Sequence, residues 1–177
     1  SRRENHAAPH LGRASRHSWY SLPAVSSFAG GLPFILFRCS SRSWICEAAV
    51  AAVGSVLRSL GLARNAIGDE GAAALSAFGG LIRSSATLTS LRLEGNEIGA
   101  AGAASLAEAM SVNTRLTNLG LELNPLGRQG AQELSTMLLT NSHLADLAIS
   151  DAELGDEGIT ALAAALRANS ALRALRL

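Results

Sequence analysis

Leucines recur along residues 57–177 in the pattern L-x-x-L-x-L, and each copy precedes a stretch with a different apolar period. The copies start 31, 28, 28 and 28 residues apart, at Leu57, Leu88, Leu116, Leu144 and Leu172. Because side chains alternate between the two faces of a strand, the last two leucines of each copy predict a short strand with one apolar face. A constant spacing of this kind indicates an array of similar units.

A helical pattern follows the strand pattern in each unit. Apolar positions at i, i+3, i+4 and i+7 predict one apolar helix face, in three sets: Ala103, Leu106, Ala107 and Met110; Ala131, Leu134, Ser135 and Leu138; Ile159, Leu162, Ala163 and Leu166. The acidic pairs Asp69–Glu70 and Asp156–Glu157 fall in the first helical turn. Negative charge there complements the helix dipole, which we favour over acid/base chemistry or metal binding.

The turn between strand and helix also has fixed positions. An asparagine follows three of the strands, at Asn65, Asn96 and Asn124, and we expect it to be buried and bonded to backbone groups of the turn. In the fourth unit Ala152 takes this place, so the row of buried amides should weaken there. A glycine suited to a tight turn precedes each helix, at Gly68, Gly99, Gly127 and Gly155.

Repetition of a strand and a crossover helix predicts an α/β solenoid. Such crossovers make neighbouring strands parallel and are right-handed in nearly all cases. Helices are wider than the spacing of about 4.8 Å between strands, so the stack should bend into a horseshoe, with parallel strands on the concave side and helices on the convex side.

The quoted residues resemble the ribonuclease-inhibitor type of leucine-rich repeat, whose pattern is L-x-x-L-x-L-x-x-N-x-I/L-G followed by G-A-x-x-L on a helix. That family includes cytosolic inhibitors, Ran GTPase-activating proteins and the sensor ends of nucleotide-binding immune receptors. The resemblance covers residues 57–177 and implies protein–protein recognition on the concave face.

Two regions are expected from these patterns. Residues 47–177 form the leucine-rich repeat domain, with four full repeats and a truncated fifth that stops within a unit, as expected for a fragment of a longer protein. Gly79–Gly80 predicts a bulge or a longer loop in the first repeat, and residues 44–56 predict a helix that covers the first strand. Residues 1–46 are a poorly structured Arg/Ser-rich segment: a transit peptide, a disordered tail or an artefact of the gene model.

Composition and charge narrow the function. Aromatic residues make up only 4% of the chain, so leucine and alanine must fill the core. Residues 1–46 contain six arginines against Glu4 alone, whereas residues 47–177 contain nine arginines against thirteen acids. This acidic body argues against nucleic acid as a partner. No apolar run reaches the roughly 18 residues needed to span a bilayer, so a membrane is not expected either.

The sequence shows none of the usual catalytic or cofactor motifs. Without any lysine there can be no phosphate-binding G-x-x-x-x-G-K loop, and H-E-x-x-H, C-x-x-C and G-x-S-x-G are also missing. Cys39 and Cys46 match no zinc or redox spacing, while Pro9 separates His6 from His10, which favours a solvated tail over a metal site. We therefore expect no enzymatic activity, cofactor, metal or small-molecule substrate.

A candidate binding surface follows from the strand positions that lie between the core leucines. On the concave face these include six polar residues: Ser90, Arg92, Glu94, Asn118, Glu122 and Asp146. Arg92 beside Glu94 and Glu122 is the best candidate patch, with a charge cluster that merely stabilises adjacent strands as the alternative.

Three functions follow from this surface. The first is a protein-interaction scaffold with a protein partner of unknown identity. It is placed in the cytoplasm because the repeats lack cysteine, which fits a reducing compartment. The alternatives are a GTPase activator of the Ran type and a structural spacer with no site of its own.

Overall fold

The computed structural model describes residues 34–36, 57–77 and 81–177, which alternate between short strands and helices. The strands are each three residues long: β1 (Phe34–Leu36), β2 (Ser59–Gly61), β3 (Ser90–Arg92), β4 (Asn118–Gly120), β5 (Asp146–Ala148) and β6 (Ala174–Arg176). The helices are α2 (Gly68–Ser76), α3 (Leu81–Ser84), α4 (Ala100–Val112), α5 (Gly127–Thr140) and α6 (Gly155–Ala168).

The six strands form one parallel sheet in chain order from β1 to β6. Its register aligns the second leucine of every repeat, so that Leu60, Leu91, Leu119, Leu147 and Leu175 stand opposite one another. The predicted arrangement of consecutive parallel strands is confirmed. The period of the leucines fixes this register because a slip of one residue would turn the leucines away from the core.

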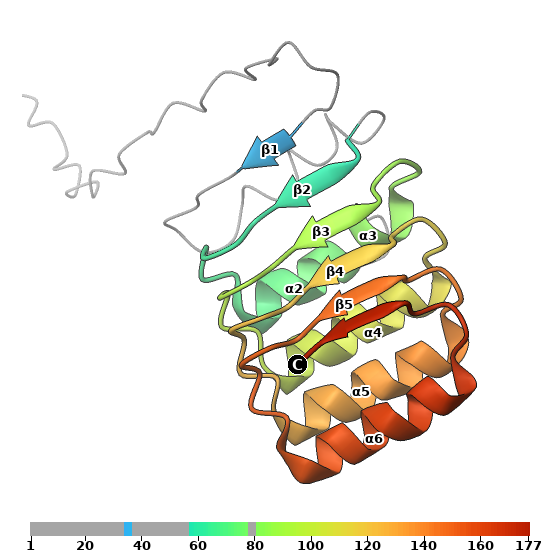
Figure 1. Cartoon of the computed structure of the whole chain (residues 1–177). Helices are drawn as coiled ribbons and strands as arrows, with labels where there is room; N and C mark the ends of the chain where they lie inside the picture. Colours follow the sequence, from blue (N-terminus) through green and yellow to red (C-terminus); the bar gives the residue numbers. More distant parts are fainter. Residues whose placement is uncertain (1–33, 37–56, 78–80) are drawn as a thin grey trace, which may run out of the picture.

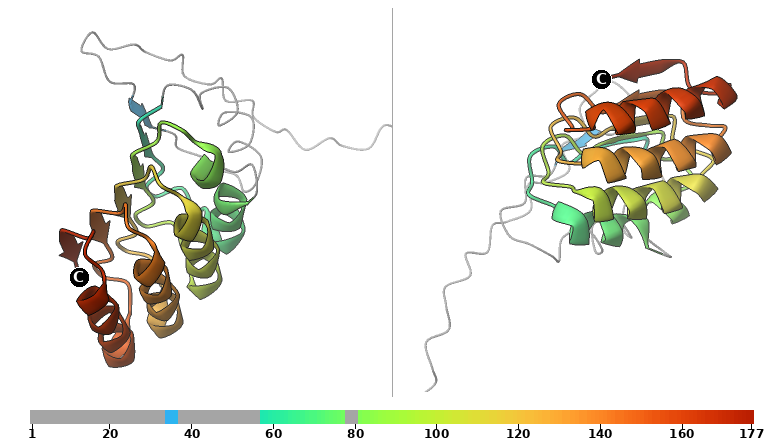
Figure 2. Two further views of the ribbon diagram at one scale, coloured as in Figure 1. Left: turned by 90° about the vertical axis from the view of Figure 1, so that its right-hand side faces the viewer. Right: turned by 90° about the horizontal axis from the view of Figure 1, so that it is seen from below.

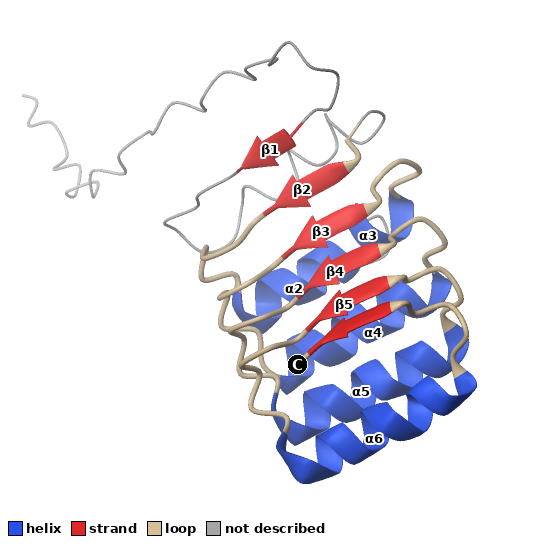
Figure 3. Cartoon of the chain, viewed as in Figure 1, coloured by secondary structure: helices blue, strands red, loops and turns tan. Residues whose placement is uncertain are grey.

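Strands and helices occupy separate layers (Figures 1 and 3), with every helix behind the sheet. Seen from the side in Figure 2, the helices are spread more widely than the strands, so the stack curves with the sheet on its inner side. Helices pack at 8–10 Å whereas strands lie about 4.8 Å apart, and this mismatch accounts for the curvature.

The core lies between the two layers and consists almost entirely of leucine, alanine and isoleucine. The predicted apolar faces of α4 and α5 are fully buried, but that of α6 is not. Ile159 remains 39% exposed and Ala163 is also exposed, because among the described residues no helix packs against the far side of α6. The expectation that these two residues are buried was therefore wrong.

The predicted row of buried asparagines joins neighbouring turns. Asn124 is 0% exposed; its Oδ1 accepts hydrogen bonds from the backbone N–H groups of Asn96 at 2.8 Å and Ile98 at 3.1 Å. In the same way, Asn96 Oδ1 accepts a hydrogen bond from Asn65 N–H at 2.7 Å. Ala152 has no side chain that could accept from Asn124, so the row ends one repeat early, as predicted.

A second asparagine row, which the sequence analysis did not identify, closes the other end of each helix. Asn113, Asn141 and Asn169 donate from Nδ2 to the carbonyl oxygens of Ile82, Met110 and Leu138 in the preceding repeat. Each Oδ1 accepts from the N–H three residues later, at 2.7–2.8 Å. These residues lie 28 apart, and Ser85 occupies the equivalent place in the first repeat.

The glycine turns before the helices take two forms. Gly68, Gly127 and Gly155 have φ between 63° and 65°, a conformation that glycine adopts at low cost. Gly99 instead has φ of −96° and forms the N-cap of α4. Its N–H donates to Asp69 Oδ1 at 2.7 Å, and the same oxygen accepts from Gly102 N–H at 2.8 Å. Asp69 lies in the first turn of α2, as predicted, and caps the neighbouring helix.

The amino-terminal part contributes one strand. β1 lies inside residues 1–46, for which no element was predicted, and pairs in parallel with β2. The helix expected over residues 44–56, the Gly79–Gly80 loop, both cysteines and the three histidines of the amino-terminal segment lie outside the described residues. The division at residue 46 stays a prediction.

Candidate functional site

The candidate binding surface lies on the strand side of the sheet, where the positions between the core leucines face away from the helices. In β3, Leu91 is 0% exposed while the side chain of Arg92 is 57% exposed. Asn118 in β4 is exposed, and Ser90 and Asp146 are half-buried at the equivalent positions of β3 and β5. The six predicted residues therefore all lie at strand or strand-end positions of one surface. Their role in binding remains a prediction.

Arg92 and Glu94 form an ion pair in the middle of this surface. The Arg92 Nε–Glu94 Oε1 distance is 2.8 Å, and only 16% of the Glu94 side chain is exposed. The hydrogen bond and the charge of Glu94 raise the pKa of Arg92 above its ordinary value, and the nearby charge of Glu122 acts in the same direction. The structure thus brings together Arg92, Glu94 and Glu122, which the sequence analysis selected as the best patch.

Gly120 makes room for this group. A Cβ atom at position 120 would lie 3.0 Å from Glu122 Oε2 and 3.0 Å from Glu94 Oε1, so both carboxylates reach over the glycine. Glu94 Oε2 and Glu122 Oε2 are buried and have no hydrogen-bond partner among the described residues. The result is a compact pair of carboxylates, with one guanidinium at its side.

A second ion pair lies farther along the same face. Arg176 Nη2 of β6 is 2.9 Å from Asp146 Oδ1 of β5, with 58% and 23% of the two side chains exposed. Asn118, between the two ion pairs, accepts a hydrogen bond from the hydroxyl of Thr117 at 2.7 Å. Both ion pairs are partly solvated and contribute little to stability, so their polar groups can exchange partners at small cost.

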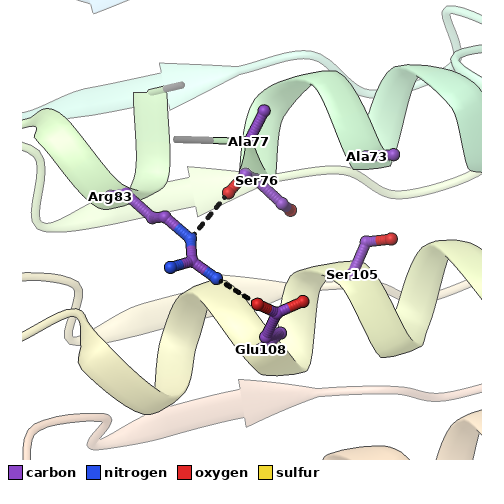
Figure 4. A pocket seen from close by; sticks show the side chains of 6 residues that line it. All are labelled: Ala73, Ser76, Ala77, Arg83, Ser105 and Glu108. Atoms are coloured by element: carbon purple, nitrogen blue, oxygen red, sulfur yellow. Dashed lines mark hydrogen bonds and ion pairs between the residues drawn. The ribbon is translucent and has the colours of Figure 1, made fainter. Parts of the chain in front are cut away.

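A pocket of about 230 Å³ opens on the helix side, between α2, α3 and α4 (Figure 4). Arg83 lies across it: Nε donates to the Ser76 carbonyl at the end of α2, at 3.0 Å, and Nη2 donates to Glu108 Oε1 at 2.7 Å. Arg83 therefore joins the shortened first helix to α4. Since Nε and Nη2 of Arg83 both donate to protein acceptors, we assign this pocket a structural role.

The described part of the chain contains no metal-binding cluster and no membrane-spanning helix. Within residues 34–36, 57–77 and 81–177, no group of three or more His, Cys, Asp and Glu side chains could hold a metal ion. Across those same residues, no helix has both the length and the apolar character needed to cross a bilayer. His143 is exposed beyond the end of α5.

Comparison with known families identifies the repeats. A family model described as "Leucine Rich repeat" matches residues 55–76, 84–107 and 140–163. The chain is a leucine-rich repeat protein. The matched segments coincide with strand-to-helix units of the observed solenoid, which confirms the predicted leucine-rich repeats. The ribonuclease-inhibitor type stays a prediction. A comparison with curated protein sequences found no match.

Two solved structures are similar to this chain in fold. One is described as "Leiomodin-1 Actin-Binding Site 2 (ABS2)", with a TM-score of 0.67, 17% identity, and coverage of 73% of this chain and 75% of that chain. The other is the tropomodulin C-terminal domain from Caenorhabditis elegans, with a TM-score of 0.62, 16% identity, and coverage of 75% and 80%. At these identities the likeness shows the fold.

One exposed residue near the site was missed by the sequence analysis of this leucine-rich repeat protein. Leu123 directly follows Glu122 and is 50% exposed, although its neighbours Leu119 and Leu121 are buried. Most leucines of these repeats are buried in the core, so residue type alone does not predict that Leu123 is exposed. Only its place in the repeat, opposite Gly95 in the preceding unit, distinguishes it.

Proposed function

We propose that this leucine-rich repeat protein is a non-catalytic recognition scaffold of the ribonuclease-inhibitor type that works in the cytoplasm. Its protein partner binds on the strand face, in contact with Ser90, Arg92, Glu94, Asn118, Glu122 and Asp146. The observation that carries this proposal is the group of Arg92, Glu94 and Glu122 gathered over Gly120. A surface that holds charged side chains in fixed positions loses little conformational entropy on binding.

The chemistry of the surface defines the partner. Three carboxylates, those of Glu94, Glu122 and Asp146, face two arginines that are already paired with two of them. Basic side chains of the partner therefore have acceptors available, whereas phosphate groups would meet like charge. This favours a protein with a basic segment over nucleic acid.

A peptide library displayed on phage and selected against the full chain tests the proposed face. Because a contact at the centre of an interface is worth more than about 1 kcal/mol, Glu122→Gln and Asp146→Ala should each weaken binding of the selected peptides about fivefold or more. Arg167→Ala, at an exposed position in the last turn of α6, is the matched control and should leave binding unchanged. Selected peptides that respond to Arg167 and ignore the strand variants would show that another surface binds.

Actin is the first defined protein to test, since one solved structure of the same fold is described as an actin-binding site. Co-sedimentation with filamentous actin, with wild type and Glu122→Gln compared side by side, measures this directly. Saturable binding that the substitution weakens would identify actin as a partner through the proposed face. Absence of binding would remove actin and leave the peptide experiment to decide the surface.

A further inference from the structure

The row of turn residues that follows the strands repeats one unusual backbone conformation. Arg64, Gly95, Leu123 and Asp151 occupy equivalent positions in four repeats and have φ of 59°, 61°, 57° and 56°. The N–H groups of the first three donate to carbonyl oxygens of the next repeat, at 2.8–3.0 Å. The pairing of neighbouring repeats therefore imposes a left-handed conformation on whichever residue occupies this position.

Leucine is an unfavourable residue for that conformation. A left-handed backbone brings Cβ too close to the following carbonyl oxygen, and only glycine, asparagine and aspartate adopt it readily. Gly95 and Asp151, on either side of Leu123, are residues of that kind. Leu123 is also 50% exposed, so burial offsets only part of the strain. A bulky side chain that is both strained and exposed is consistent with a functional position.

The surroundings of Leu123 favour presentation of its side chain to a partner. Gly95 on one side has no side chain of its own, and Arg64 Cγ lies 3.3 Å from where its Cβ would be. Pro125 follows two residues later, fixes its own φ and brings Leu126 N–H to the Asn124 carbonyl at 2.7 Å. A loop held in this way presents its apolar group without further ordering on binding.

The charges around Leu123 define the chemistry of its partner. The three turn segments 94–97, 122–125 and 150–153 contain five acidic residues and no basic one: Glu94, Glu97, Glu122, Asp151 and Glu153. Glu97, Asp151 and Glu153 are exposed. An exposed apolar side chain with acidic residues in its own turn and in both neighbouring turns is complementary to an apolar side chain flanked by lysine or arginine.

We propose that Leu123 is an apolar anchor for a segment of the partner that carries one large apolar residue between basic residues. This inference rests on the proposed function and extends its surface from the strands to the adjoining turns. The turns that surround Leu123, residues 94–97, 122–125 and 150–153, form what we term the acidic rim.

Titration of the nitrogen-15-labelled full chain with short synthetic peptides tests the acidic rim. Three peptides are compared: one with leucine at the centre of an arginine-rich sequence, the same peptide with alanine at the centre, and a third with leucine among glutamates. The first should shift amide signals of the acidic rim and bind about fivefold more tightly than the second, because leucine removes more apolar surface from water. The third should not bind.

Matched variants assign the effect to Leu123. Leu123→Asn keeps a residue suited to the left-handed turn and should weaken the leucine peptide about fivefold while leaving the alanine peptide unchanged. Leu139→Gln removes a leucine that is 59% exposed on α5 and should change neither affinity. The double variant Glu97→Gln and Glu153→Gln keeps the leucine and should weaken both basic peptides.

The outcomes separate this inference from the proposed function. Equal affinity of the leucine and alanine peptides, an unchanged affinity in Leu123→Asn, or no binding at millimolar peptide would each overturn the anchor. Signals that shift only at Arg92, Asn118 and Asp146 would overturn the anchor and support the strand face. Shifts confined to residues 95–97, 123–124 and 150–153 would support the anchor and count against the strand face, because Glu94 and Glu122 belong to both surfaces.

Discussion

Replacement of Asn124 by alanine tests how the repeats are held together. The side chain of Asn124 is fully buried; its Oδ1 accepts from Asn96 N–H and Ile98 N–H, and its Nδ2 donates to the Leu93 and Leu121 carbonyls at 2.8 and 3.0 Å. Alanine would leave two buried N–H groups without an acceptor. A buried donor that loses its partner costs about 1–3 kcal/mol, so the free energy of unfolding should fall by about 2–6 kcal/mol.

This loss is large beside the total stability of a domain of this size, which is commonly about 5–15 kcal/mol. Urea denaturation followed by circular dichroism measures it, with the urea dependence compared between proteins to detect a loss of cooperativity. Asn118→Ala is the matched control, because the same atoms are removed six positions earlier from an exposed residue of the same repeat. A decrease below about 0.5 kcal/mol for Asn124→Ala, or equal decreases for both variants, would refute the role assigned to the buried amide.

Four further substitutions have defined outcomes, each measured by the same denaturation experiment. Leu121→Ala should cost about 2–5 kcal/mol through the cavity it leaves, while Arg92→Ala should stay within about 0.5 kcal/mol; equal tolerance would contradict the assigned strand faces. Asp69→Ala removes the acceptor of two N–H groups of the next helix and should cost about 1–2 kcal/mol, whereas an unchanged stability would show that water replaces it. Ala152→Asn should restore an acceptor for Asn124 N–H and add about 0.5–1.5 kcal/mol; a loss would mean that the turn has no room for the amide.

The leucine spacing was sufficient to predict the strands and their register. Leu91, Leu119 and Leu147 stand opposite one another because equal intervals in the chain leave equal offsets in the sheet. β1 could not be predicted in the same way, since residues 34–36 carry no repeat pattern. Their pairing with β2 depends on an open strand edge and on no periodic signal of their own.

Contacts between repeats were harder to predict than contacts within one. Asp69 was assigned to the dipole of its own helix, although its carboxylate caps α4 thirty residues later. That contact depends on how far α2 and α4 are shifted along each other, which cannot be predicted from the repeat pattern. The spacing of Asn113 and Asn141 was visible in the sequence, but the expected role of asparagine had been confined to the turn after the strand. Ile159 shows a third limit, because a helical pattern gives the apolar face without showing what covers it.

The candidate surface was likewise predictable in part: contacts within one strand could be predicted, and contacts between strands could not. Alternation along the strands correctly placed Arg92 and Glu94 side by side, because that step needs only the period of two. The approach of Glu94 and Glu122 over Gly120 depends on side-chain conformations across two strands. Leu123 is exposed for a reason of backbone geometry, which the pattern of apolar residues does not record.

The two asparagine rows give the solenoid unequal fastenings. The row at the helix ends runs through Asn169, whereas the row after the strands stops at Asn124. The turn at Ala152 is therefore held to the preceding repeat by backbone hydrogen bonds alone, such as the one from Gly127 N–H to the Ala152 carbonyl at 3.1 Å. Thermal fluctuations should lift this turn first, and backbone amides around Ala152 should exchange with deuterium faster than those around Asn96.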